Sequence, residues 1–159
     1  MRVNFKLNKT PVQIEAVANE KLVHVLRREF GLMSLKSSCH KGQCGACTVL
    51  MNEKPVSSCI IPVFKAEDAD IVTLEYFKTT QEYKTIIAGF DLAGVKTCGF
   101  CDAGKIFFTY AVMKSDLNIS DPACKEKIRM FYSGIMCRCT SFDDLFSAVK
   151  KIGKLPRKK

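Results

Sequence analysis

The residues of this sequence best suited to chemistry are its nine cysteines. Eight of them form two groups, and Cys124 stands apart. Val3, Phe5 and Leu7 alternate with polar residues, which is unlike a secretory signal, so we expect an intracellular, cytoplasmic protein. In that compartment cysteines more often bind metal or carry out redox chemistry than form structural disulfides. Their spacing therefore indicates which chemistry to expect.

The first group has the spacing Cys-x4-Cys-x2-Cys with a fourth cysteine eleven residues later: Cys39, Cys44, Cys47 and Cys59. This is the plant-type [2Fe–2S] spacing. A loop around a small anionic cluster must point backbone N–H groups at its sulfurs, and Gly42 and Gly45 suit the backbone angles required. We expect a [2Fe–2S] cluster here, and the alternatives are a zinc loop or buried free cysteines.

The second group consists of two close pairs separated by 35 residues: Cys98 and Cys101, then Cys137 and Cys139. Two pairs held at helix ends can converge on one metal centre. The spacing alone is compatible with iron–sulfur and with zinc. The remaining Cys124 is expected to be a small buried hydrophobic residue inside a helix.

The first half of the chain shows mainly strand periodicity. Alternating apolar residues predict strands at about 3–7, 12–16, 48–51, 56–61 and 71–74. A helical pattern follows Asn19, a possible N-cap, and stops at Gly31. The segment 34–47 has neither period and is expected to be a loop wrapped around a ligand.

The second half shows only helical periodicity. Helices are predicted at about 79–92, 103–115, 121–132 and 140–152. Their ends are expected near Gly89, Gly94, Gly99, Gly104 and Gly134, and Asp121-Pro122 is a favourable helix start. The predicted class is α+β, with one domain at 1–76 and a helical domain at 77–159 that ends in a basic tail.

The sequence around the cysteines also carries a family resemblance. The motifs are Cys39-His40-Lys41-Gly42-Gln43-Cys44-Gly45-Ala46-Cys47-Thr48-Val49, Ser58-Cys59, Cys98-Gly99-Phe100-Cys101 and Cys137-Arg138-Cys139-Thr140. In this order they resemble the iron–sulfur subunit of the molybdenum hydroxylases, the xanthine dehydrogenase and aldehyde oxidase family. The resemblance covers nearly the whole chain.

This resemblance implies a plant-ferredoxin-like β-grasp domain followed by a four-helix-bundle domain, each with one [2Fe–2S] cluster. By position, the first four cysteines hold one cluster, and Cys98, Cys101, Cys137 and Cys139 hold the other. It further implies a molybdopterin-binding large subunit near the helical domain and an FAD-binding medium subunit near the ferredoxin-like domain. The chain would then pass electrons one at a time from molybdenum to FAD, with no catalytic residue of its own.

Several positions depart from the family pattern. Thr97 stands where the family has a glutamine that reaches the pterin, and Asp102-Ala103 replaces Thr-Pro. Tyr76 and Ser141-Phe142 replace Gly and Gly-Tyr. None of these residues is an expected cluster ligand, so we interpret the chain as a divergent member with a changed partner surface.

Two polar residues inside the motifs have open roles. His40 is expected to be a loop residue, because four cysteines already supply the ligands. Arg138 either places positive charge beside a cluster and raises its potential, or is an ordinary surface arginine.

Composition and charge exclude some functions and leave others open. The net charge is +9, but six basic residues and no acidic residue lie in the last ten positions, so the preceding 149 residues carry only +3. With no aromatic residues among these basic groups, we expect no nucleic-acid binding, and no apolar run is long enough for a membrane helix. The alternatives to the electron-transfer subunit are a free-standing ferredoxin-like carrier and a zinc-stapled binding module.

Overall fold

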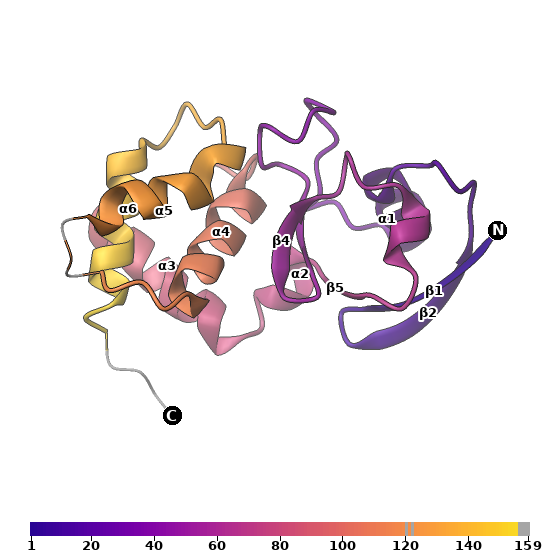
Figure 1. Ribbon diagram of the computed structural model, residues 1–159, viewed down its shortest axis with the longest axis horizontal. Helices are drawn as coiled ribbons and strands as arrows, with labels where there is room; N and C mark the ends of the chain where they lie inside the picture. Colours follow the sequence, from indigo (N-terminus) through magenta and orange to yellow (C-terminus); the bar gives the residue numbers. More distant parts are fainter. Residues whose placement is uncertain (120, 122, 156–159) are drawn as a thin grey trace.

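The computed structural model describes residues 1–119, 121 and 123–155 and has two lobes (Figure 1). The strands are β1 (Arg2–Leu7), β2 (Thr10–Glu15), β3 (Thr48–Met51), β4 (Lys54–Ser57) and β5 (Asp70–Val72). The α-helices are α1 (Leu22–Phe30), α2 (Leu74–Phe77), α3 (Gln81–Ala93), α4 (Asp102–Lys114), α5 (Cys124–Phe131) and α6 (Phe142–Ile152). Short 3-10 helices span Val63–Ala66 and Tyr132–Gly134. The α+β prediction is confirmed.

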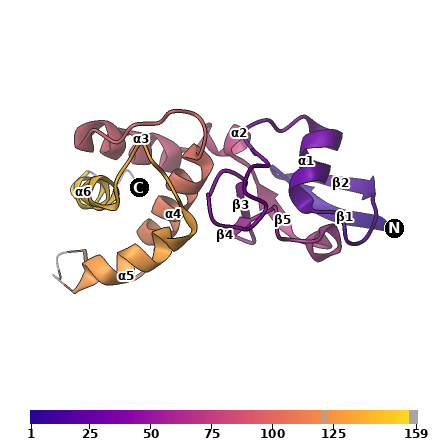
Figure 2. The ribbon, with the colours of Figure 1, turned by 90° about the horizontal axis from the view of Figure 1, so that it is seen from above.

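The first lobe is a mixed five-stranded sheet covered on one face by α1 (Figure 2). The strand order is β2-β1-β5-β3-β4, in which β1 and β5 are parallel and the other neighbours are antiparallel. As the alternation predicts, Val3, Phe5 and Leu7 are buried on the face beneath α1. Asn8 and Lys9 turn the hairpin with positive φ.

Helix α1 ends as predicted but does not begin as predicted. Gly31 closes it in the left-handed conformation, with φ 63°. Its N-cap is Lys21 rather than Asn19, and no side chain caps the first turn. Instead, the N–H of Leu22 donates to the carbonyl of Ile61 at 2.9 Å. The start of α1 is therefore set by a contact distant in sequence.

The second lobe is formed by α3, α4, α5 and α6, close to their predicted ranges. Two of the glycines expected near helix ends, Gly89 and Gly104, lie within α3 and α4 and make close contacts there. At Gly89, within α3, an added Cβ would lie 2.2 Å from Ile152 Cγ1 of α6. Gly94 does terminate α3, with φ 71°, whereas Pro122 lies outside the described residues. Within the described parts of the chain, no helix is long and apolar enough to cross a membrane.

The lobes meet where β3 and β4 pack against α4. Adjacent residues of β3 face opposite sides, so Val49 joins the core beneath α1 while Leu50 joins the core of the helices. Above this strand the Gly45 backbone touches Gly104 of α4. An added Cβ at Gly104 would lie 2.7 Å from the carbonyl oxygen of Gly45. Gly104, near the start of α4, is therefore a contact residue between the lobes.

We predict that Gly104→Ala destabilises the holoprotein, because its methyl group would meet backbone that cannot rotate away. The expected loss in the free energy of unfolding is about 1–3 kcal/mol, measured by urea denaturation. Gly153→Ala is the matched control: φ is −60° there, and an added Cβ meets nothing closer than 3.5 Å. Equal stability of the two variants would contradict this view of the contact.

Candidate functional site

The eight grouped cysteines lie in loops at element ends. The first group occupies the loop between α1 and β3 and the turn after β4. The second occupies the loop before α4 and the loop between α5 and α6. In Figure 1 the loop after α1 and the loop after α5 rise on the same side of the molecule. All nine cysteines are free thiols.

In the first group, the thiols lie as two pairs. Cys44 is the thiol neighbour of Cys39, and Cys59 is the thiol neighbour of Cys47. Cys39 and Cys44 are partly exposed, whereas Cys47 and Cys59 are buried in the core beneath α1. One pair thus lies toward solvent and the other toward the protein interior.

The loop backbone points donors at the outer pair. The N–H of Lys41 donates to Cys39 Sγ at 3.4 Å, and the N–H groups of Gln43 and Cys44 also donate to it. These hydrogen bonds, that of Lys41 first, lower the pKa of Cys39 to about 6. The turns require left-handed backbone at Gly42 and Gly45, as the sequence predicts. The loop is therefore built to stabilise negative charge on sulfur.

The inner pair, Cys47 and Cys59, is shielded from solvent. Burial raises the pKa of the Cys47 thiol to about 12, although the Cys59 N–H acts in the opposite direction. Ser58 Oγ donates to the Cys47 carbonyl at 2.6 Å and joins the two cysteine segments. These contacts place the pair at the base of the loop.

The second group also lies as two pairs. Cys137 is the thiol neighbour of Cys101, and Cys98 is the thiol neighbour of Cys139. Burial raises the pKa of Cys101 to about 12. At Cys137 burial opposes the charge, but the N–H groups of Cys139 and Thr140 and the Cys101 thiol outweigh it and lower the pKa. The structure thus brings together all four cysteines from two distant segments.

The paired arrangement bears on what the groups can bind. Among the described residues, no three His, Cys, Asp or Glu side chains gather where one metal ion could hold them. Two thiolates on each of two irons is the ligation that a [2Fe–2S] cluster takes from four cysteines. Both groups present two pairs and therefore fit that requirement.

The other candidate residues lie apart from the thiols or at the surface. Cys124 is buried in the helical core and donates to the Ile119 carbonyl at 3.4 Å. The His40 ring stacks on His24, with centroids 5.8 Å apart. Thr97 and Arg138 are exposed.

Sequence reasoning missed one residue beside the second group. Lys105, on α4, has no solvent-exposed surface. Its Nζ lies 3.0 Å from Asp102 Oδ1, and its charge acts on the Cys101 and Cys137 thiols. The available signal was its position one helical turn after Cys101.

Comparison with known proteins matches both lobes. Residues 5–72 match a family described as a 2Fe-2S iron-sulfur cluster binding domain, and residues 73–150 match a [2Fe-2S] binding domain. The nicotinate dehydrogenase small FeS subunit of Eubacterium barkeri is 34% identical over 93% of this chain and 92% of its own length. The xanthine dehydrogenase iron-sulfur-binding subunit of Escherichia coli O157:H7 is 33% identical over 92% and 91%.

The fold comparison agrees with these sequence matches. A chain of quinoline 2-oxidoreductase from Pseudomonas putida 86 superposes with a TM-score of 0.79 and 28% identity, covering 94% of this chain and 90% of that one. The relatives are subunits of oxidoreductases and span nearly the same length, which does not favour a free-standing ferredoxin or a zinc module. The chain belongs to the iron–sulfur subunits of the molybdenum hydroxylases and is the electron-transfer subunit of a xanthine dehydrogenase-type oxidoreductase.

Proposed function

We propose that each cysteine group holds one [2Fe–2S] cluster. The ligands of the first would be Cys39, Cys44, Cys47 and Cys59, and those of the second Cys98, Cys101, Cys137 and Cys139. The observation that carries the assignment is the arrangement of each group as two thiol pairs. Each group also falls inside one of the two matched [2Fe-2S] families.

We propose that the clusters belong to two domains with a boundary inside α2. Residues 1–76 would form a plant-ferredoxin-like β-grasp domain, and residues 77–159 a four-helix-bundle domain with a basic tail whose residues 156–159 lie outside the described chain. Two cores support the presence of two domains, one beneath α1 and one among the helices, and Leu50 and Leu74 pack from the first domain into the second core. The split at 72 and 73 between the matched families also supports it.

The clusters would connect cofactors on other subunits. When bound, a [2Fe–2S] cluster supplies one-electron chemistry, which is useful between two-electron centres. We propose a molybdopterin-binding large subunit against the helical domain around Thr97, and an FAD-binding medium subunit near the loop from His40 to Gln43. This chain's residues hold and insulate the clusters and tune their charge. The relatives are themselves named as subunits, which supports such partners.

We also propose that the complex works in the cytoplasm, without nucleic acid or membrane. A chain whose nine cysteines form no disulfide suits a reducing compartment.

We predict that the purified holoprotein contains about four irons and about four acid-labile sulfides. Cys47→Ser is expected to halve both contents and to remove one of two paramagnetic signals of the reduced protein, because the other group lies in the other lobe. Metal analysis and electron paramagnetic resonance measure this.

Cys124→Ala is the matched control for that experiment. It is expected to keep both signals and all the iron, at a stability cost of up to about 3 kcal/mol from lost packing. Loss of both signals in Cys47→Ser, or loss of iron in Cys124→Ala, would mean that the ligand sets are wrong.

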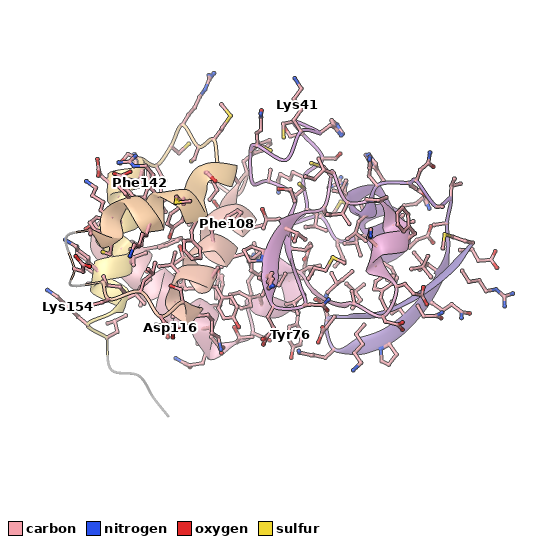
Figure 3. The ribbon with its side chains drawn as sticks, in the orientation of Figure 1. Lys41, Tyr76, Phe108, Asp116, Phe142 and Lys154 are labelled. Carbon is pink, nitrogen blue, oxygen red and sulfur yellow. The ribbon has the colours of Figure 1, made fainter. Side chains whose placement is uncertain are left out.

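A second prediction tests the orientation in the complex. Lys41 is exposed at the tip of the first cysteine loop (Figure 3). In the native complex, Lys41→Glu is expected to slow flavin reduction several-fold, and less so at high salt, without changing reduction of the clusters by substrate. Stopped-flow spectroscopy resolves the two steps.

Lys154→Glu makes the same charge change in the other lobe, where Lys154 is also exposed (Figure 3), and is expected to alter neither rate. The complex itself is tested by purifying a tagged chain from its own cells. If neither a flavoprotein nor a molybdopterin protein accompanies it, or if Lys41→Glu slows both steps equally, the proposed arrangement fails.

A further inference from the structure

Lys105 is the one charged residue in the buried core of the described chain, with no solvent-exposed surface. Burying an ammonium group is costly unless the charge is paired and hydrogen-bonded. Its backbone N–H donates to the Cys101 carbonyl at 3.2 Å, so it lies one turn further along the same face of α4 as that cysteine. A core position next to the second thiol group therefore holds a charge where packing alone would favour an apolar residue.

The charge is held by a network that also ties the cysteine loops together. Lys105 Nζ lies 3.0 Å from Asp102 Oδ1 and donates to the Lys96 carbonyl at 2.5 Å. The other carboxylate oxygen of Asp102 accepts a hydrogen bond at 2.9 Å from the N–H of Gly99, which lies between Cys98 and Cys101 in the sequence. Thr140, after the last cysteine, donates to the same Lys96 carbonyl at 3.1 Å. Lys105 is thus fixed relative to both loops.

The contacts of Lys105 place its charge among the cysteine segments. Its Nζ is held between the carbonyl of Lys96, two residues before Cys98, and the carboxylate of Asp102, directly after Cys101. Thr140, directly after Cys139, shares the Lys96 carbonyl. The cation is therefore buried beside the segments that carry Cys98, Cys101 and Cys139.

We propose that the Lys105 ammonium raises the reduction potential of the centre held by the second cysteine group, with Asp102 as the positioning residue that holds and partly offsets it. The proposal rests on the ligand assignment above. One-electron reduction adds a negative charge to the centre, and a fixed cation in a dry setting stabilises that state more than the oxidised one. Because the pair is buried, added salt should screen it weakly.

The test is a redox titration of the native complex, with the two reduced-cluster signals followed separately by electron paramagnetic resonance. Lys105→Met removes the cation and is expected to lower the one-electron equilibrium constant of the second centre at least tenfold, which is about 59 mV. Asp102→Asn removes the offsetting anion and should raise the potential. The double variant should lie between the wild type and Lys105→Met.

Opposite shifts in reduction potential from the two single variants distinguish an electrostatic role from a structural one. Loss of a merely structural ion pair would change the second centre in the same way in both variants. Lys114→Met, an exposed lysine at the far end of the same helix, makes the same charge change and should leave the potential unchanged. The first centre should also keep its potential in every variant.

The proposal is overturned if Lys105→Met leaves the second potential unchanged or raises it, or if Asp102→Asn lowers it. If Lys105→Met loses the second centre, the proposal is tested on the other two variants. The potential of the second centre must then rise in Asp102→Asn and fall below the wild-type value in the double variant. Absence of a second signal in the wild type would instead refute the ligand assignment.

Discussion

The contact between Gly45 and Gly104 is the constraint on which the arrangement of this protein depends. Gly45 lies between two cysteines of the first group, and Gly104 lies three residues after Cys101 of the second. Because neither has a side chain, loop backbone and helix backbone approach so closely that an added Cβ would overlap. Electron transfer falls steeply with distance, so a contact of backbone on backbone between the cysteine segments serves an electron-transfer subunit directly. The packing of β3 and β4 on α4 supports the same junction.

Negative charge on the sulfurs is stabilised in different ways in the two thiol groups. Around Cys39, backbone N–H groups of an exposed loop stabilise it, and left-handed turns at Gly42 and Gly45 shape that loop. Around Cys101, the buried ammonium of Lys105 adds a full charge. Hydrogen bonds to sulfur, nearby charge and burial all set the potential of an iron–sulfur centre. The two groups therefore differ in which of these factors surrounds their sulfurs.

The solvent exposure of the two thiol groups relates the chain to its proposed partners. The outer thiol pair of the first group lies toward solvent beside the exposed Lys41, and the Cys98 end of the second group is also exposed. Each group therefore has one side turned inward and one toward the surface. Such a chain can accept electrons at one surface and deliver them at another, as an electron-transfer subunit must.

Local features of this fold could be predicted from the sequence, because short-range geometry determines them. The alternation of Val3, Phe5 and Leu7 defines one face of a strand, and Gly31 has the freedom in φ that closes a helix. The cysteine spacing likewise indicated the chemistry of the first group, since ligand spacing reflects the size of the loop around a cluster, whereas the second group needed the family resemblance.

Only the tertiary structure decided the features that depend on contacts between distant segments. The start of α1 is set by Ile61 rather than by a local cap at Asn19. The close contact of Gly104 with the first loop exists only because α4 packs against that loop. The burial of Lys105 follows from the convergence of the segments containing Lys96, Asp102 and Thr140, and no periodicity along the chain encodes such a convergence.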